Sequence, residues 1–567
     1  MPLNSLLAAN ESELNMKNLS KLSRFVILGL TVLFFTILLA ELSTRIIFPW
    51  DTILWPESPF MTNMMKLDSG MSVFSPPEDA NSTIYSPGIE YVSYFLLKPL
   101  EFQLDIRFSR LVTVFLGFLA AFIAAMNASR LGTAMSGFTI GAKQFLFTYV
   151  VCCLLLFKNV TSDVPHPDNL HILHALVVLL MGYTSIIRRN FYLALFTMAL
   201  AGLGVLIKQN AMLSFVGAGI GLLIGARWGI LKSSALVLVG IGVFAASLSG
   251  LMFTQFGKFH LFDLVVSQST SSAVLQTTHM LKSPHHLVLL CLAVLVFPRL
   301  ARIREEKVRA FLLMWGGVGI AEALPGLAAY LKINAAWNNL GIIMVWLFII
   351  VWPFIGFSSV QNITRKSRTG LIPLSSKQLA AISLLVISLI PLRLPPESSH
   401  YRFYSELESS VVNDVRQGKR VLVPHGTMLF LRNGLHEVPL DRAMSYLEYS
   451  ASGKESSART IQRIKDKFYD VIYMDSLSWL YGPKVLAAIA ENYKEVHRLC
   501  LAENGDQQSL LSPISCPVVP WHRRLMSGHI VGWQCRLIDD VKTLCPRATS
   551  AIVTGGAGSL ATGYSQR

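Results

Sequence analysis

The sequence is poor in charge: only 15% of its 567 residues are Asp, Glu, Lys or Arg, whereas soluble domains carry about a quarter. Hydrophobic residues make up 52% of the chain, and the mean hydropathy is +0.49. The charge deficit is concentrated in long apolar blocks, nearly all of them before residue 394. These blocks exclude an ordinary soluble domain and are typical of a membrane protein.

Several signatures of soluble enzymes are also missing. The chain has no phosphate-binding glycine loop, no nucleophile elbow and no internal repeat. Cysteine is scarce, with seven in all, and the spacing of those in the C-terminal tail does not indicate zinc. If the tail lies outside the cell membrane, its even number of cysteines predicts one or two disulfides, with free thiols as the open alternative. These tail cysteines are Cys500, Cys516, Cys535 and Cys545.

The net charge of +15 does not indicate nucleic-acid binding, because the basic residues stand in short runs between the apolar blocks. Such runs are what the positive-inside bias produces at the cytoplasmic ends of spans. The strongest runs are Arg188 and Arg189, then Arg299, Arg302, Arg304, Lys307 and Arg309, and then Arg365, Lys366 and Arg368.

The apolar blocks predict a polytopic α-helical protein with about 11 transmembrane helices, each of about 20 residues. The first block follows Lys17, Lys21 and Arg24 and is too long for a cleavable signal peptide, so residues 1–24 are predicted to be cytoplasmic. The transmembrane domain then covers residues 25–393, with a long outer loop over residues 48–105. The predicted spans are 25–46, 108–128, 144–158, 170–187, 191–207, 211–226, 234–253, 287–299, 309–330, 339–357 and 378–393.

The tail, residues 394–553, predicts a soluble α/β domain on the outer side of the membrane. Residues 420–424 and 469–474 have the pattern of buried strands, and residues 458–468 and 484–493 that of helices. Residues 554–567 are rich in Gly and Ser and are predicted to be disordered. An odd number of spans places this domain opposite the cytoplasmic N-terminus.

Polar residues gather in the predicted outer loops, next to the membrane boundary. The first loop carries Asp51 and Glu57, the second carries Asp163, His166 and Asp168, and the third begins with Lys208. Acids, a histidine and a lysine could therefore converge at one membrane interface. Such polar groups next to the membrane mark functional sites.

The order of these residues resembles the type-C superfamily of polytopic glycosyltransferases, which take a sugar from a polyprenyl-phosphate carrier. Members have a carboxylate in a long first outer loop, then a glycine, then Tyr-x-Pro before span two, which Glu57, Gly70 and Tyr85-Ser86-Pro87 match. A Gly-x-x-x-Lys-Gln segment at the outer end of a later span is matched by Gly204, Lys208 and Gln209. The resemblance covers residues 25–360, approximately.

The resemblance implies that a sugar moves from a polyprenyl-phosphate carrier to an extracytoplasmic glycan, lipid or protein by a single inverting displacement. A carboxylate would act as the base, with Glu57 as first candidate, Asp51 as second and Asp168 as a further one. Lys208, His166 and Tyr85 would contact the carrier phosphate or the donor. Whether Mg²⁺ or Mn²⁺ takes part is left open, with Glu57, Asp163 and Asp168 as the ligands if it does.

Two other classes of protein remain open. A transporter or lipid flippase would carry ionisable residues within its spans, and Glu322 in span nine is one such residue. A non-catalytic assembly protein that presents the tail to partners would tolerate changes of the outer-loop acids. The resemblance places a glycosyltransferase in a plasma membrane of the bacterial inner-membrane type, and leaves the sugar and the acceptor unspecified.

Overall fold

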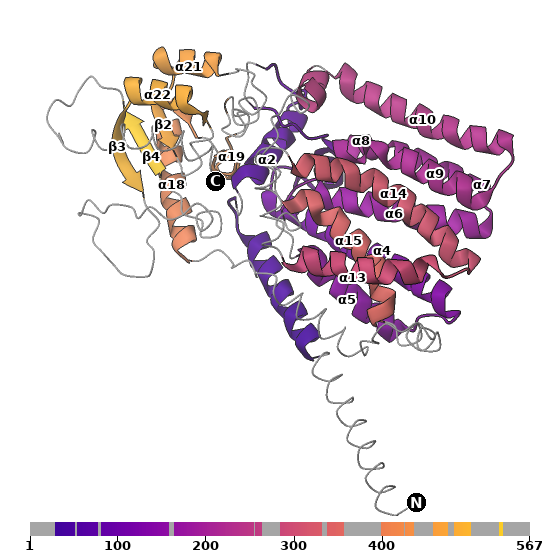
Figure 1. Cartoon of the computed structure of the whole chain (residues 1–567). Coiled ribbons are helices and arrows are strands. Elements are labelled where there is room, and N and C mark those ends of the chain that lie inside the picture. The colour runs from indigo at the N-terminus through magenta and orange to yellow at the C-terminus, as the bar shows by residue number, and fades with distance from the viewer. Residues whose placement is uncertain are drawn as a thin grey trace, which may run out of the picture. The chain divides into compact units, whose positions relative to one another are not determined.

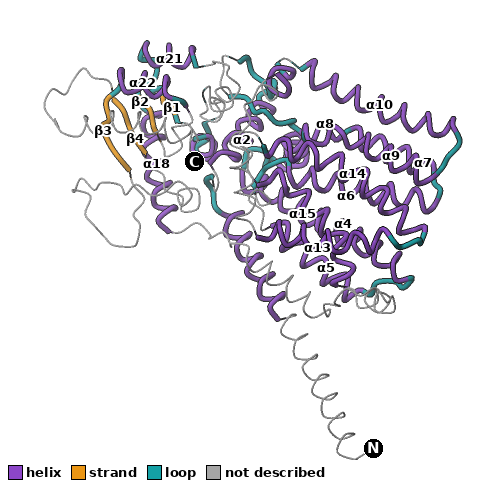
Figure 2. Tube along the Cα trace, viewed as in Figure 1, coloured by secondary structure: helices purple, strands orange, loops and turns teal. Residues whose placement is uncertain are grey.

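The structure is a computed structural model of the whole chain and is mostly helical (Figures 1 and 2). It describes residues 29–51, 54–77, 81–157, 164–254, 256–263, 284–331, 337–356, 398–423, 426–435, 441, 457–474, 481–499 and 532–536. The chain divides into two compact units. Unit 1 comprises Met1–Thr44, Leu111–Ser249 and Gln276–Arg393, and unit 2 comprises Arg45–Arg110, Gly250–Leu275 and Leu394–Arg567.

Unit 1 is a bundle of helices that lie side by side (Figure 1). Its elements are the helix Gly29–Ile47 (of which the last three residues belong to unit 2), α4 (Ile106–Ser136, of which the first five residues belong to unit 2), α5 (Ala142–Phe157), α6 (Asp168–Arg188), α7 (Phe191–Gly202), α8 (Gly204–Ile207), η2 (Gln209–Leu213), α9 (Ser214–Ala226), α10 (Ile230–Phe253, of which the last four residues belong to unit 2), α13 (Pro284–Ala301), α14 (Glu306–Tyr330), η4 (Trp337–Leu340) and α15 (Gly341–Gly356).

These helices confirm the predicted apolar blocks as helical wherever the structure describes them. Six are long and apolar enough to cross a membrane, and they begin at Gly29, Ile106, Asp168, Gln209, Ile230 and Glu306. Four shorter apolar helices lie at the remaining described blocks. Large apolar side chains point outward, and Leu238 on α10 is 68% exposed, which in water would be unfavourable. The fold is that of a membrane-embedded polytopic protein, and the predicted span at 378–393 lies outside the described residues.

Helices α9 and α14 make the tightest crossing in unit 1, and glycine permits it. A Cβ on Gly217 would lie 2.2 Å from the carbonyl oxygen of Gly317, and a Cβ on Gly317 would lie 2.3 Å from that of Gly217. Small residues let membrane helices approach backbone to backbone, where van der Waals contact replaces the hydrophobic effect. The crossing sets the spacing between Ser214 on α9 and Glu322 on α14.

The predicted fifth span is interrupted at Leu203, and the predicted loop at Lys208 separates it from the sixth span. Helix α7 ends at Gly202, the single turn α8 ends at Ile207, and η2 leads into α9. Between α8 and η2, Lys208 has an extended backbone with φ −157° and ψ 140°. Such breaks are tolerated at membrane depth where the backbone is buried in protein or lines a polar site.

Unit 2 joins parts of the chain that are far apart in sequence. The long first loop is largely helical, with α2 (Leu54–Asp68), α3 (Gly88–Leu97) and η1 (Lys98–Leu100). Residues 250–275 add the π-helical turn η3 (Phe259–Asp263), where His260 Nε2 donates to the Ser75 carbonyl at 2.9 Å. Gly70 ends α2 with φ +68°, a left-handed conformation that favours glycine. The glycine of the first-loop pattern therefore has a local reason, the end of a helix.

The tail contributes the rest of unit 2. Its elements are α18 (Ser398–Arg416), β1 (Val421–Leu422), α19 (Thr427–Arg432), α21 (Ala458–Lys465), β2 (Val471–Met474), α22 (Pro483–Asn492), β3 (Lys494–Leu499) and β4 (Gly532–Arg536). The strands form one sheet in the order β1-β2-β4-β3, with β1 and β2 parallel and the other two pairs antiparallel. The predicted strands at 420–424 and 469–474 and helices at 458–468 and 484–493 are therefore confirmed as elements.

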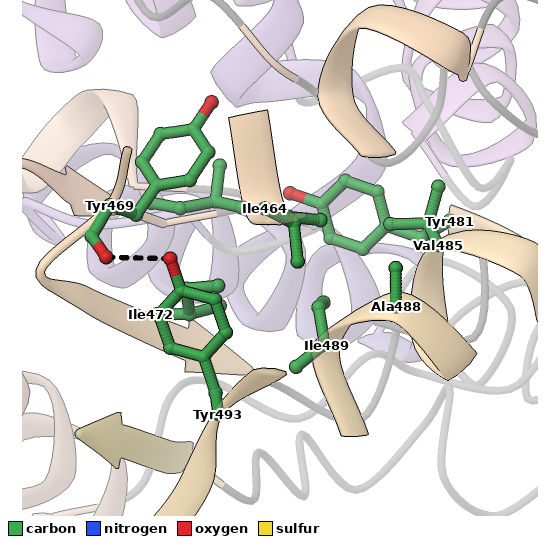
Figure 3. Close-up of a cluster of buried hydrophobic side chains, with 9 residues drawn as sticks. Ile464, Tyr469, Ile472, Tyr481, Val485, Ala488, Ile489 and Tyr493 are labelled. Atoms are coloured by element: carbon green, nitrogen blue, oxygen red, sulfur yellow. Dashed lines mark hydrogen bonds between the residues drawn. The ribbon is translucent and has the colours of Figure 1, made fainter. Parts of the chain in front are cut away.

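Apolar side chains of α21 and α22 pack on this sheet (Figure 3). Ile464, Ile472 and Val485 are fully buried there, and Tyr493 donates its hydroxyl proton to the Tyr469 carbonyl at 2.6 Å. The cysteine side chains of the predicted disulfides lie outside the described part of this domain. Cys500, Cys516 and Cys545, together with residues 554–567, lie outside the described residues, as does the side chain of Cys535.

Candidate active site

The first candidate centre lies in unit 2, where the chain leaves its first span. Asp51 is only 4% exposed, and its Oδ2 accepts a hydrogen bond from the Ser58 hydroxyl at 3.1 Å. Its Oδ1 is buried with no hydrogen-bond partner among the described residues. Its backbone carbonyl accepts from the Tyr404 hydroxyl at 3.3 Å. One carboxylate oxygen of Asp51 thus remains available to a ligand.

Glu57 lies in the first turn of α2, where a carboxylate suits the positive end of the helix dipole. It is fully buried and forms a two-pronged ion pair with Arg110: Nε lies 2.6 Å from Oε1 and Nη2 lies 3.0 Å from Oε2. Both carboxylate oxygens are therefore held by the guanidinium group. This planar, bidentate geometry gives the pair strength and a fixed orientation.

Arg110 does more than neutralise Glu57. Its Nη1 donates to the carbonyls of Arg45, at 2.9 Å, and Phe48, and its Nη2 donates to that of Trp50 at 2.5 Å. The side chain is completely buried and fastens the chain that leaves the first span. The sequence analysis did not single out Arg110. The sequence feature that could have identified Arg110 is its place at the predicted outer end of span two, where the positive-inside bias disfavours a cation.

The environment of Asp51 changes its acidity. Burial raises the pKa of Asp51 well above its usual value, and the nearby charge of Glu57 raises it further. The charge of Arg110 and the Ser58 hydrogen bond act in the opposite direction but are weaker. A carboxylate whose pKa is raised holds a proton more strongly and is therefore a better general base than an ordinary aspartate.

Behind these residues, the first loop is held by a second buried cation that sequence reasoning missed. Lys66 on α2 is fully buried, and its Nζ donates to the carbonyls of Val73, at 3.0 Å, and Asn81, at 2.9 Å. Asn63, one turn earlier, donates to Glu90 of α3 at 2.9 Å. Tyr85 lies half-buried just before α3. These contacts fix the segment between α2 and α3.

The second candidate centre lies in unit 1, at the start of α6. Asp168 is the first residue of this helix, and its Oδ1 lies 2.6 Å from Lys208 Nζ. Its Oδ2 lies 2.8 Å from His166 Nδ1, and all three side chains are buried. The sequence predicted that these residues come together, and within unit 1 they do. Lys208 reaches Asp168 from the break between α8 and η2.

One turn further along α6 lies another buried ion pair. His171 Nε2 is 2.6 Å from Glu322 Oε2 on α14, and the Ser214 hydroxyl of α9 donates to Glu322 Oε1. His174 Nε2 donates to the Leu200 carbonyl at 2.8 Å, at the end of α7. His171 is thereby paired with Glu322, the ionisable residue of the predicted span nine.

The described residues do not form a metal site. They contain no group of three or more His, Cys, Asp or Glu side chains that could hold a metal ion. The oxygens of Glu57 and Asp168 are already engaged by basic side chains. The third ligand suggested by the sequence, Asp163, lies outside the described residues. A divalent cation therefore does not fit Glu57 and Asp168 as they stand.

Comparison with known proteins gives no family for the chain. No protein-family model matches it, and no curated protein matches it. Among solved structures, it is similar to the crystal structure of the Archaeoglobus fulgidus oligosaccharyltransferase in the apo form, with a TM-score of 0.48 and 10% sequence identity. The match covers 83% of this chain and 73% of that chain. A similarity of this size does not assign a function to the chain.

Proposed function

We propose that the protein is a membrane glycosyltransferase that moves a sugar from a polyprenyl-phosphate carrier to an extracytoplasmic acceptor, with Asp51 as the general base. The observation that carries the proposal is Asp51 itself. It is buried, its Oδ1 has no partner among the described residues, and its pKa is raised. Glu57, the first candidate from the sequence, becomes a positioning residue in this proposal because Arg110 occupies both of its oxygens.

In the proposed step, one bond to the anomeric carbon forms while another breaks. The Asp51 carboxylate removes the proton of an acceptor hydroxyl as its oxygen attacks the anomeric carbon. The bond from that carbon to the carrier phosphate oxygen breaks, and its electron pair stays on the phosphate. The acceptor could belong to a glycan, a lipid or a protein.

In unit 1, Lys208 and His166 remain the candidates for an anionic group such as the carrier phosphate. Lys208 contacts Asp168 through one ammonium proton, and an ammonium group has three protons to donate. A buried carboxylate between two basic side chains also fixes both of them in place. Asp168 would accordingly position these groups and would not be the base.

The composition of unit 2 supports the predicted sidedness. The first loop, residues 250–275 and the tail belong to one compact unit, so they must share one side of a membrane. The predicted topology places all three outside. In the proposal this side is the outer face of a plasma membrane of the bacterial inner-membrane type.

The test compares Asp51→Asn with Asp68→Asn in cells, scored by sugar incorporated into surface glycan or lipid at equal membrane expression. Asp68 is an exposed acid at the end of α2 and is the matched control. Loss of a general base is expected to lower transfer by about 10²- to 10⁴-fold in the Asp51 variant, with little change in the control. Normal transfer by Asp51→Asn would refute the proposed role of Asp51.

A lipid flippase or transporter is the second candidate, and the Glu322–His171 pair favours it. This pair is buried between membrane helices, where ionisable groups are costly and mark pathways in transporters. Purified protein in vesicles with a labelled polyprenyl-phosphate sugar separates the two functions. Movement of the label across the bilayer without transfer to any acceptor, abolished in Glu322→Gln, would select the transporter.

A further inference from the structure

The tail and the first loop meet inside unit 2 at the residues that flank Asp51. Trp50 Nε1 donates to Glu408 Oε2 of α18 at 3.0 Å, and its ring stacks on Tyr404 with centroids 5.5 Å apart and planes 12° apart. The guanidinium of Arg432 lies 4.9 Å from the Trp50 ring centroid. Trp50 is 6% exposed. A single aromatic residue of the loop is thus held by three side chains of the tail.

Neighbouring residues extend this contact. Phe48 packs edge-on against Tyr401, with centroids 4.9 Å apart, and against Tyr404, at 5.7 Å. The Tyr404 hydroxyl also reaches the Asp51 carbonyl. Aromatic pairs in these geometries each contribute about 0.5–1.5 kcal/mol beyond the area they bury. The contact therefore covers the loop continuously from Phe48 to Asp51.

A second contact holds α2, the helix that carries Glu57. The hydroxyls of Thr62 on α2 and Thr427 on α19 lie 3.0 Å apart and are buried. Helix α19 is tied to α18 in turn, because Arg432 and Asn433 both donate to Glu408, at 3.1 Å and 2.7 Å. Glu408 thus links α18 and α19 of the tail to Trp50 of the loop.

We propose that α18 and α19 form a clasp that positions Asp51, so that the tail is a working part of the catalytic centre and not only a recognition domain. The clasp consists of Tyr404, Glu408, Thr427 and Arg432. This inference rests on the proposed function, because it assumes that Asp51 is the base. Its physical basis is the position of Asp51 between the end of the first span and helix α2. The clasp contacts the chain on both sides of Asp51 and so fixes it.

The clasp has a consequence for pH as well as for rate. Asp51 is buried and its backbone carbonyl accepts from Tyr404 of the clasp, and burial is the largest cause of its raised pKa. The charged groups that act on it are Glu57 on α2 and Arg110 on α4. Loosening the clasp while both charges remain would admit water and lower the pKa of Asp51 toward its ordinary value. The acid limb of the pH–rate profile would then move to lower pH.

The experiment uses the full-length protein and two matched variants of α18, Glu408→Gln and Glu406→Gln. Glu406 lies on the same helix, and among the described residues its carboxylate pairs with exposed Arg402 alone, so its substitution controls for a lost carboxylate on α18. Glu408→Gln is expected to lower kcat by about 10- to 100-fold, the effect of a small misplacement of a catalytic group. The KM for the lipid-linked donor is expected to change less than twofold. Glu406→Gln should match the unmodified protein.

Hydrogen–deuterium exchange provides a readout that does not depend on activity. The peptide ending at Asp51 should exchange faster in Glu408→Gln than in Glu406→Gln. Tyr404→Phe is the milder variant if Glu408→Gln folds poorly, because it removes only the hydroxyl and keeps the stacking on Trp50. It should show the same acid-limb shift in a smaller amount.

The outcomes separate the clasp from the proposed function. If Asp51→Asn is inactive but Glu408→Gln and Tyr404→Phe keep full kcat and an unchanged pH profile, the clasp is refuted and the function stands. Faster exchange without loss of transfer refutes positioning by the clasp. If Asp51→Asn transfers sugar normally, the assignment of the base fails, whatever the exchange result.

Discussion

Buried carboxylates occur in both units, but they are compensated differently. In unit 1, Asp168 lies between Lys208 and His166, and Glu322 lies beside His171. In unit 2, Glu57 has Arg110, whereas Asp51 has only the Ser58 hydroxyl and an unpartnered oxygen among the described residues. A buried charge without a cation is expensive, and of these four carboxylates Asp51 is the one that forms no ion pair among the described residues.

This difference distinguishes the carboxylates that stabilise the fold from the one that could react with a ligand. A carboxylate with both oxygens held by a cation is fixed in direction and is less available to a ligand, which is the state of Glu57. Asp51 keeps one oxygen without a partner among the described residues, and its raised pKa makes proton uptake easier than at an ordinary aspartate. Uncompensated groups of this kind are where function is expected. The anchors around Asp51 hold it in a place that it would not otherwise occupy.

The largest effect is expected from Arg110→Met, which removes the strongest anchor in unit 2. Breaking a buried ion pair costs about 3–5 kcal/mol. Here three backbone carbonyls also lose their donor, at about 1–3 kcal/mol each. The detergent-solubilised variant should fail to accumulate or should unfold at a much lower temperature. A normal unfolding temperature would mean that Glu57 and Arg110 do not anchor the loop.

A smaller loss, about 3 kcal/mol, is expected from Lys208→Met in unit 1, because Asp168 keeps His166 as a second partner. The double variant Lys208→Met with Asp168→Asn has no uncompensated charge and should recover much of the stability. Thermal unfolding of the single and double variants measures this coupling. Strictly additive losses would show that the two side chains act independently. Transfer activity should remain low in the double variant if Lys208 binds the carrier phosphate.

Asp51→Asn should behave in the opposite way to an anchor, with a stability that depends on pH. Because the folded-state pKa of Asp51 is raised above its ordinary value, the protonated form stabilises the fold. That contribution is complete below the unfolded-state pKa and is lost as pH rises through the folded-state pKa. The unfolding temperature of the variant relative to the unmodified protein should rise across this window and then level off. A constant difference would mean that Asp51 does not titrate in this range.

Much of the fold follows from the sequence because apolar length and charge placement determine it. Spans near 108–128, 170–187 and 309–330 lie within helices α4, α6 and α14. The loop at Lys208 between the spans 191–207 and 211–226 was predicted, but the interruption at Leu203 between α7 and α8 was not, since that segment is apolar throughout. The helical first loop was not predicted either. Helices α2 and α3 hold buried polar residues such as Asn63 and Glu90, whose partners are distant in sequence.

The candidate site was predictable in its members but not in its pairings. The grouping of His166, Asp168 and Lys208 came from their position at predicted span ends. The order of Glu57 and Asp51 could not be decided, because that depends on which carboxylate Arg110 meets, across 53 residues of chain. The contact of Trp50 with Glu408 is separated by 358 residues and leaves no local pattern. Sequence identifies chemically capable residues, and tertiary contacts decide which of them remain available.

The smallest effect is expected at an exposed ion pair of the tail, Asp470 with Arg420. Burial acts to raise the pKa of Asp470, but hydrogen bonds from the Arg420 backbone and side chain outweigh it and hold the pKa below its usual value. A lowered folded-state pKa gives stability that is present above the unfolded-state pKa and is lost as pH falls through the folded-state one. Because the pair is exposed to solvent, Asp470→Asn should cost less than about 1 kcal/mol at neutral pH. Thermal unfolding in 1 M salt should shrink even this difference, whereas the loss caused by Arg110→Met, at a fully buried pair, should persist.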